Sequence, residues 1–154
     1  MTMSTREEGE TDLVVTRRFK APPERIFLAH VEPDLIRRWM NVGDDWTMDI
    51  VSCDARPGGD FRYDYANGEM SFSIQGTFLE LEPPRRILHE ETMAMDPPCG
   101  PSRVETLLEP DGTGTRMVMT ISYPDAEARA RMLGMGMTEG MASTYDALDA
   151  LEPD

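Results

Sequence analysis

The sequence has little of what metal centres, disulfide scaffolds and membrane spans are built from. Its 154 residues include two histidines and two cysteines, and Cys53 and Cys99 stand far apart without a CxxC partner. Because a structural metal site takes about four converging ligands, we expect no metal and no cofactor, and we interpret both cysteines as free thiols. No apolar run approaches the roughly 20 residues of a membrane span, and the N-terminus lacks the order of a signal peptide. We therefore expect a cytoplasmic protein.

Basic residues are also few, with 15 against 29 acidic ones and a formal net charge of −14. Such a charge repels phosphate backbones and anionic lipids, so we expect neither nucleic acid nor membrane as a partner. The simplest interpretation of the acidity is solubility. The length suits one domain with its own core. We place that domain at residues 11–154, after a polar, disordered tail over residues 1–10.

The C-terminal stretch from Tyr123 to Leu151 is predicted to form one long amphipathic helix, with Asp125 near its start. Apolar residues recur along it at spacings of three and four, namely Ala130, Leu133, Met137, Met141, Tyr145 and Leu148. Gly134, Gly136 and Gly140 interrupt the pattern, and each destabilises a helix by about 1 kcal/mol relative to alanine. Close packing against a sheet and a cavity at that level are the two interpretations of these glycines.

The rest of the chain alternates between apolar and polar residues, as half-buried strands do. Phe61, Tyr63 and Tyr65 share one face of the clearest strand. Strands are predicted over 11–19, 46–53, 60–65, 70–81, 86–95, 103–108 and 115–123, with two short helices over 24–30 and 34–40. The pattern therefore predicts an α+β fold in which a curved antiparallel sheet of about seven strands surrounds the C-terminal helix.

Residues spread from Leu13 to Leu148 carry a family resemblance. They are Arg17, Phe19, Ala21, Pro22, Phe27, Ala29, Pro33, Leu35, Trp39, Asp54, Arg56, Pro57, Gly58, Gly59, Gly76, Pro83, Pro84, Arg85, Ile87, Gly114, Thr115 and Arg116. In this order they resemble START-like (SRPBCC) domains of the branch named after the activator of Hsp90 ATPase. The resemblance implies the helix-grip (Bet v 1-like) fold, in which the sheet wraps the long helix and often leaves an apolar cavity. The chain departs from the family pattern after Trp39, where Met40, Asn41, Val42 and Gly43 stand in place of a second tryptophan, glycine and proline.

Methionine is frequent, with 13 residues, and its unbranched, polarizable side chain accommodates varied apolar shapes. A packed core is the default interpretation of these methionines, since methionine tolerates almost any packing position. If a cavity is present, we expect it to be lined by Trp39, Phe61, Tyr63, Phe72, Ile74, Phe78, His89, Met117, Met119, Met137, Met141 and Tyr145.

Three polar residues could have structural or functional roles. His89 shares its strand face with Glu91 and points toward the cavity, where we favour a structural role over acid–base work. Arg17 has the parity of the buried face, and we favour a strand edge or bulge that lifts it into solvent over a functional group in the cavity. His30 ends a short helix, where a charged ring would suit the negative helix end.

Three functions follow from these features. The first is a binding module for a small apolar or aromatic molecule. The second, implied by the resemblance, is a protein-interaction module that binds a chaperone. The third is an enzyme of the cyclase or hydrolase type with His89 or Arg17 in the cavity, and fold analogy is its main support. No serine stands in a GxSxG elbow and Glu90 and Glu91 point to opposite strand faces, so we assign no catalytic residue.

Overall fold

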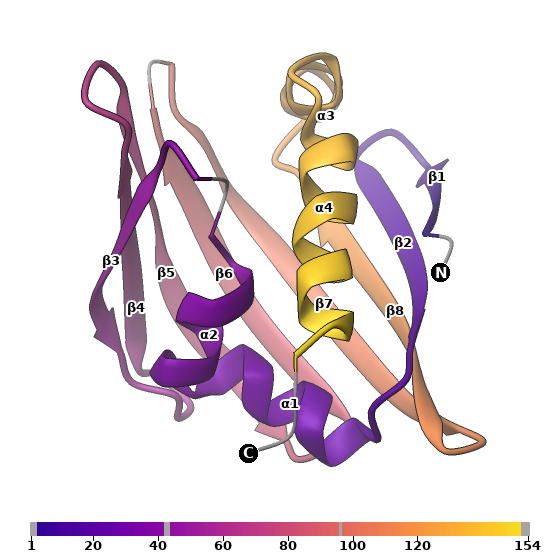
Figure 1. Cartoon of the computed structure of the whole chain (residues 1–154). Helices are drawn as coiled ribbons and strands as arrows, with labels where there is room; N and C mark the ends of the chain where they lie inside the picture. The colour runs from indigo at the N-terminus through magenta and orange to yellow at the C-terminus, as the bar shows by residue number, and fades with distance from the viewer. Residues whose placement is uncertain (1–2, 42–43, 96, 152–154) are drawn as a thin grey trace.

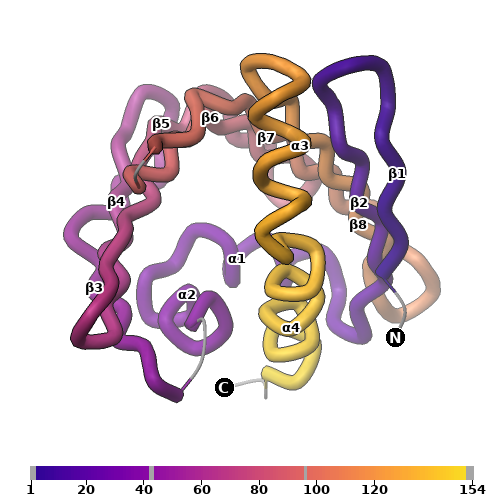
Figure 2. Tube along the Cα trace, turned by 90° about the horizontal axis from the view of Figure 1, so that it is seen from above, coloured from indigo at the N-terminus to yellow at the C-terminus, as the bar shows by residue number. Residues whose placement is uncertain are grey.

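The computed structural model of this protein describes residues 3–41, 44–95 and 97–151. The segments in which apolar and polar residues alternate form its sheet. In these ranges eight antiparallel strands form one sheet in the order β1-β2-β8-β7-β6-β5-β4-β3. The strands are β1 Ser4–Glu8, β2 Asp12–Phe19, β3 Thr47–Cys53, β4 Asp60–Ala66, β5 Ser71–Glu82, β6 Arg86–Ala94, β7 Cys99–Asp111 and β8 Gly114–Ser122. The sheet curves round α4 as an arch (Figures 1 and 2).

The helices are α1 Pro23–Val31, α2 Pro33–Trp39, α3 Ala126–Gly134 and α4 Met137–Asp149. As predicted, two short helices follow the first long strand, and each has a proline in its first turn, where the missing N–H is no loss. They lie on the concave side of the arch (Figure 2), and α2 contacts α4. The α+β helix-grip architecture is therefore confirmed.

The strand count differs from the predicted seven because β1 occupies part of the segment expected to be disordered. Ser4–Glu8 is exposed along its whole length and pairs with β2, Ser4 opposite Thr16 and Glu8 opposite Asp12. Backbone pairing with a neighbouring strand orders this polar segment, which no apolar pattern announces. Met1 and Thr2, at the start of the expected tail, lie outside the described residues.

The C-terminal helix is two helices, so the prediction of one continuous helix is wrong. Asp125 begins α3 by accepting a hydrogen bond from the backbone N–H of Ala128 at 2.7 Å. After Gly134 the chain turns through Gly136, whose φ of 80° lies in the left-handed region that glycine adopts at little cost. A helix cannot continue through that conformation, and α4 leaves in a new direction (Figure 1).

Two arginines hold α3 over one end of the sheet. Arg129 donates to the carbonyl oxygens of Gly9 at 3.1 Å and Asp12 at 2.9 Å, in and beside the turn between β1 and β2. Arg131 donates to the Pro98 carbonyl at 2.7 Å, just before β7. The helix is thereby attached to the β1–β2 turn at one edge of the sheet and to the start of β7 near its middle.

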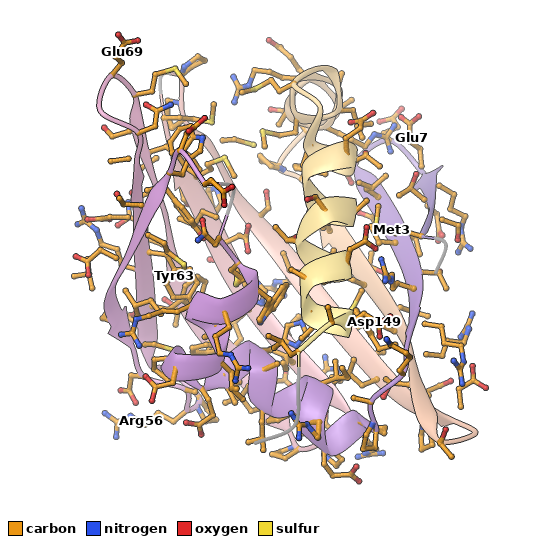
Figure 3. The ribbon with its side chains drawn as sticks, viewed as in Figure 1. Met3, Glu7, Arg56, Tyr63, Glu69 and Asp149 are labelled. Carbon is orange, nitrogen blue, oxygen red and sulfur yellow. The ribbon has the colours of Figure 1, made fainter. Side chains whose placement is uncertain are left out.

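Arg17 attaches α4 to β2. Its side chain is 2% exposed, and its guanidinium bonds the Asp146 carboxylate at 2.6 Å and lies 3.7 Å from that of Asp149. Asp149 also accepts the backbone N–H of Lys20, and it lies at the end of α4 beside β2 (Figure 3). The parity of Arg17 was predicted correctly, but its placement in solvent was wrong, because two helix carboxylates pair with a buried cation.

Candidate ligand-binding cavity

A cavity of about 460 Å³ lies between the concave face of the sheet and α4. Strands β4 to β8 supply one wall, and all four helices contribute the rest. Its rim includes exposed residues on two sides, Asn41 after α2 and Gly140 with Ser143 on α4. The cavity therefore opens between the end of α2 and the flank of α4. Val42 and Gly43, which continue the departure from the family pattern, lie outside the described residues.

The structure brings together eleven of the twelve residues predicted to line a cavity. These are Trp39, Phe61, Tyr63, Phe72, Ile74, Phe78, His89, Met119, Met137, Met141 and Tyr145. Met117 is the exception, since it is completely buried in the core. It shares the inner face of β8 with Met119, as predicted, but it stands opposite Arg17, where α4 is bound to the sheet. The part of β8 that lines the cavity begins at Met119, the next residue on the same face of the strand.

Ring contacts fix the aromatic walls. Trp39 stacks on Tyr145 with 5.7 Å between ring centroids, and its indole N–H donates to the Ala29 carbonyl at 2.8 Å. On the opposite side Tyr65 stacks on Phe72 at 4.8 Å. Such stacked pairs lie within the 4.5–7 Å range in which aromatic rings attract each other. The walls are therefore preformed.

Two tyrosine hydroxyls reach methionine sulfur atoms across the cavity wall. The Tyr145 hydroxyl donates to Met119 Sδ at 3.2 Å, and the Tyr123 hydroxyl donates to Met137 Sδ at 3.0 Å. Thioether sulfur is a weak acceptor. A ligand with a stronger hydrogen-bond acceptor can therefore replace the sulfur atom as the partner of either hydroxyl at a small cost in free energy.

A carboxylate and an imidazole form the polar part of the cavity. His89 and Glu91 share the inner face of β6, and His89 Nε2 lies 2.7 Å from Glu91 Oε1. The His89 ring also meets Phe61 edge to face at 5.5 Å. Because Nε2 faces a carboxylate oxygen, it carries the proton and donates it. Sequence reasoning placed Glu91 on this face but did not include it among the lining residues.

Four tyrosines around the cavity remain protonated. Burial raises the pKa of Tyr63, Tyr65, Tyr123 and Tyr145 well above the ordinary phenol value, and the Glu91 carboxylate raises each pKa further. These tyrosines come from β4, from the segment after β8 and from α4.

His30 is a neutral group beside the Trp39 wall. Its Nδ1 donates to the Ile26 carbonyl at 2.7 Å, and its ring meets Trp39 edge to face at 5.1 Å. Burial lowers the pKa of His30 to about 4. The interpretation of a charged ring at the helix end is therefore wrong. Within the described residues, the buried Nε2 atom has no hydrogen-bond partner.

The helix glycines do not mark close packing. A Cβ atom added at Gly134 or Gly140 would meet nothing within 4 Å. Gly140 lines the cavity entrance and Gly134 does not. Of the two interpretations, the structure favours the cavity at Gly140, while Gly136 serves the turn between the helices.

Residues missed by sequence reasoning fall into two groups. Some had a usable signal, because the period of two places them on the inner face of a strand: Tyr65, Ile87, Met93, Val104, Thr106 and Ile121. Others come from long-range packing: His30, Met40, Asn41, Cys99, Ser102, Tyr123, Met132, Gly140, Ser143, Thr144 and Ala147. Over the described ranges, no group of three or more potential metal ligands forms, and no helix is long and apolar enough to cross a membrane.

Solved structures share this fold. A protein of Rhodobacter sphaeroides is 27% identical with a TM-score of 0.87, and the match covers 96% of both chains. A protein of Mycobacterium smegmatis is 22% identical with a TM-score of 0.86, covering 97% of this chain and 96% of the other. One of Rhizobium loti is 26% identical with a TM-score of 0.67, covering 94% and 99%. No curated protein matches the sequence significantly.

The family model described as activator of Hsp90 ATPase homolog 1-like protein matches residues 20–152. That range runs from the end of β2 to beyond the last described residue, so it includes nearly every element that forms the cavity. It also agrees with the helix-grip architecture and with the resemblance in the sequence. The chain belongs to the family of activator of Hsp90 ATPase homolog 1-like proteins.

Proposed function

We propose that this protein binds a small apolar or aromatic molecule in the cavity between its sheet and α4. The observation that carries the proposal is a preformed space of about 460 Å³ with aromatic and methionine walls and an entrance beside α4. Ligand sites of about 300–1,000 Å³ with mostly apolar walls and a few polar groups are typical of proteins that bind small molecules. An apolar cavity of about 150 Å³ holds one benzene, so this space suits a molecule of two or three rings.

The two helix glycines provide a matched test. Gly140→Leu places a side chain at the entrance, whereas Gly134→Leu places the same side chain on a helix surface outside the cavity. Both substitutions favour the helical state, by up to about 0.8 kcal/mol each, because leucine has the higher helix propensity. A loss of binding in a protein that is no less stable then reports obstruction and not misfolding.

Binding is followed by the fluorescence of N-phenyl-1-naphthylamine, a neutral two-ring probe. We expect the unmodified protein and Gly134→Leu to bind it equally, and Gly140→Leu to bind it at least fivefold more weakly. Ile74→Trp, which fills the cavity from β5, should abolish binding. Absence of binding by the unmodified protein, or full binding by both Gly140→Leu and Ile74→Trp, would overturn the proposal.

Chaperone binding and catalysis remain predictions. The family description names an activator of Hsp90 ATPase, and recovery of purified Hsp90 on the immobilised protein is the direct measurement. For catalysis, Arg17 is not among the residues that line the cavity, which leaves His89 as the predicted acid–base group. His89→Ala should reduce turnover of any substrate that the cavity converts, and unchanged turnover would exclude this role.

A further inference from the structure

Few ionisable side chains line the cavity. Glu91 is the single carboxylate among the described lining residues, and none of those residues is a lysine or an arginine. Of the two imidazoles, His30 is held neutral by burial and His89 is engaged with Glu91. A ligand in this cavity therefore meets one negative charge and, from these walls, no fixed positive one.

The Glu91 carboxylate has a free side. Oε1 accepts a hydrogen bond from His89 Nε2, and within the described part of the chain no other hydrogen bond to this carboxylate is formed. The side chain is 30% exposed, compared with 18% for His89. Since a carboxylate has about four acceptor sites, several remain for a donor that enters from the cavity.

The surroundings of Glu91 also favour positive charge. Tyr63, Tyr65, Tyr123 and Tyr145 line the same cavity as Glu91, and Phe61 meets its partner His89 edge to face. Aromatic faces attract an ammonium group that is brought out of water. The acidic protein as a whole, with a net charge of −14, adds a long-range attraction for cations.

We infer that the ligand is an arylalkylamine, an amine on an aliphatic carbon attached to aromatic rings, that binds as a cation, with its ammonium group on Glu91 and its rings against the aromatic walls. This inference rests on the proposed function and specifies its ligand class. A carboxylate-bearing ligand such as a fatty acid is disfavoured, because the lining offers its charge no cationic partner and places Glu91 against it. A neutral aromatic alcohol should fall between the two.

Three ligands that differ in one group test the inference at pH 8. They are 1-naphthylmethylamine, 1-naphthylmethanol and 1-naphthylacetate, titrated by calorimetry or by displacement of N-phenyl-1-naphthylamine. We expect the amine to bind at least tenfold more tightly than the alcohol, and the acetate to bind most weakly. Equal affinity of amine and alcohol would overturn the inference and leave the cavity as a binding site. Failure of all three and of the neutral probe would overturn the proposed function itself.

Two neighbouring glutamates separate the site from the general charge of the protein. Glu91→Gln removes one charge inside the cavity, and Glu90→Gln removes one charge on the outer face of the same strand, where Glu90 faces Arg103. We expect Glu91→Gln to abolish the preference for the amine over the alcohol. Glu90→Gln should keep the preference. An equal loss in both variants would assign the preference to long-range attraction, and retention of the preference in Glu91→Gln would refute the role of Glu91.

Discussion

Replacing Arg17 by methionine should release α4 from the sheet. The long apolar stem is kept, so the loss reports the charge of a side chain that is 2% exposed. Asp146 is 67% exposed and returns to water at little cost, whereas Asp149 is 10% exposed and keeps only the Lys20 N–H. Removing one partner of a buried ion pair typically costs 3–5 kcal/mol. Because one of the two carboxylates is solvated, we expect a loss of about 3 kcal/mol.

Urea denaturation measures this loss, and a double-mutant cycle assigns it. A loss of about 3 kcal/mol lowers the melting temperature of a domain of this size by about 6–12 °C. Adding Asp149→Asn to Arg17→Met should restore at least about 1 kcal/mol, because the unpaired buried carboxylate is then removed. Asp146→Asn alone should cost less than about 1 kcal/mol. A cost below about 1 kcal/mol for Arg17→Met, or no coupling with Asp149, would refute the assignment of Arg17 as the attachment of α4.

Two further predictions concern His30 and Gly136. Burial lowers the pKa of His30 to about 4, below the ordinary value of 6.5, so the folded state prefers the neutral ring. The stability that depends on this neutral ring is therefore fully present above pH 6.5 and is lost as the pH falls toward 4. The loss should reach roughly 3 kcal/mol, read from urea midpoints against pH, and His30→Phe should remove this dependence. An unchanged dependence would contradict the assignment. Gly136→Ala should cost about 1 kcal/mol because its φ is 80°, whereas Gly134→Ala should stabilise the protein, and equal effects in thermal denaturation would show that the helix break is not needed.

The inner faces of the strands could be predicted from the sequence because their period is local. Phe61, Tyr63 and Tyr65 alternate with polar residues on β4, and all three line the cavity. The same period placed His89 and Glu91 together on one face of β6. Each of these inferences needs only neighbours in sequence. The order of the elements was predicted from the same pattern, and the family resemblance added the helix-grip fold.

Features that depend on distant partners were not predictable in the same way. Arg17 is buried because α4 brings Asp146 to it across 129 positions of sequence. The polar segment of β1 is ordered by backbone pairing, which leaves no apolar signature. Met117 has the correct parity for the cavity, yet it lies where the helix closes on the sheet and not where the two diverge. The period of two identifies the strand face on which a residue lies. Whether that residue lines the cavity or is buried in the core depends on how closely the helix packs against the sheet at its position.

The break at Gly136 and the open entrance at Gly140 connect the helix sequence to the cavity. Because the chain turns at Gly136, α3 contributes Met132 and α4 contributes Met137 to the same space. The Tyr123 hydroxyl bonds Met137 at this corner, so the end of β8 and the start of α4 are held together. Gly140 destabilises α4 by about 1 kcal/mol relative to alanine and leaves the entrance without a side chain. A residue that weakens its helix, leaves free space where a Cβ atom would stand and lies at an entrance fits the proposed ligand binding, which is why Gly140→Leu is the most direct test of that proposal.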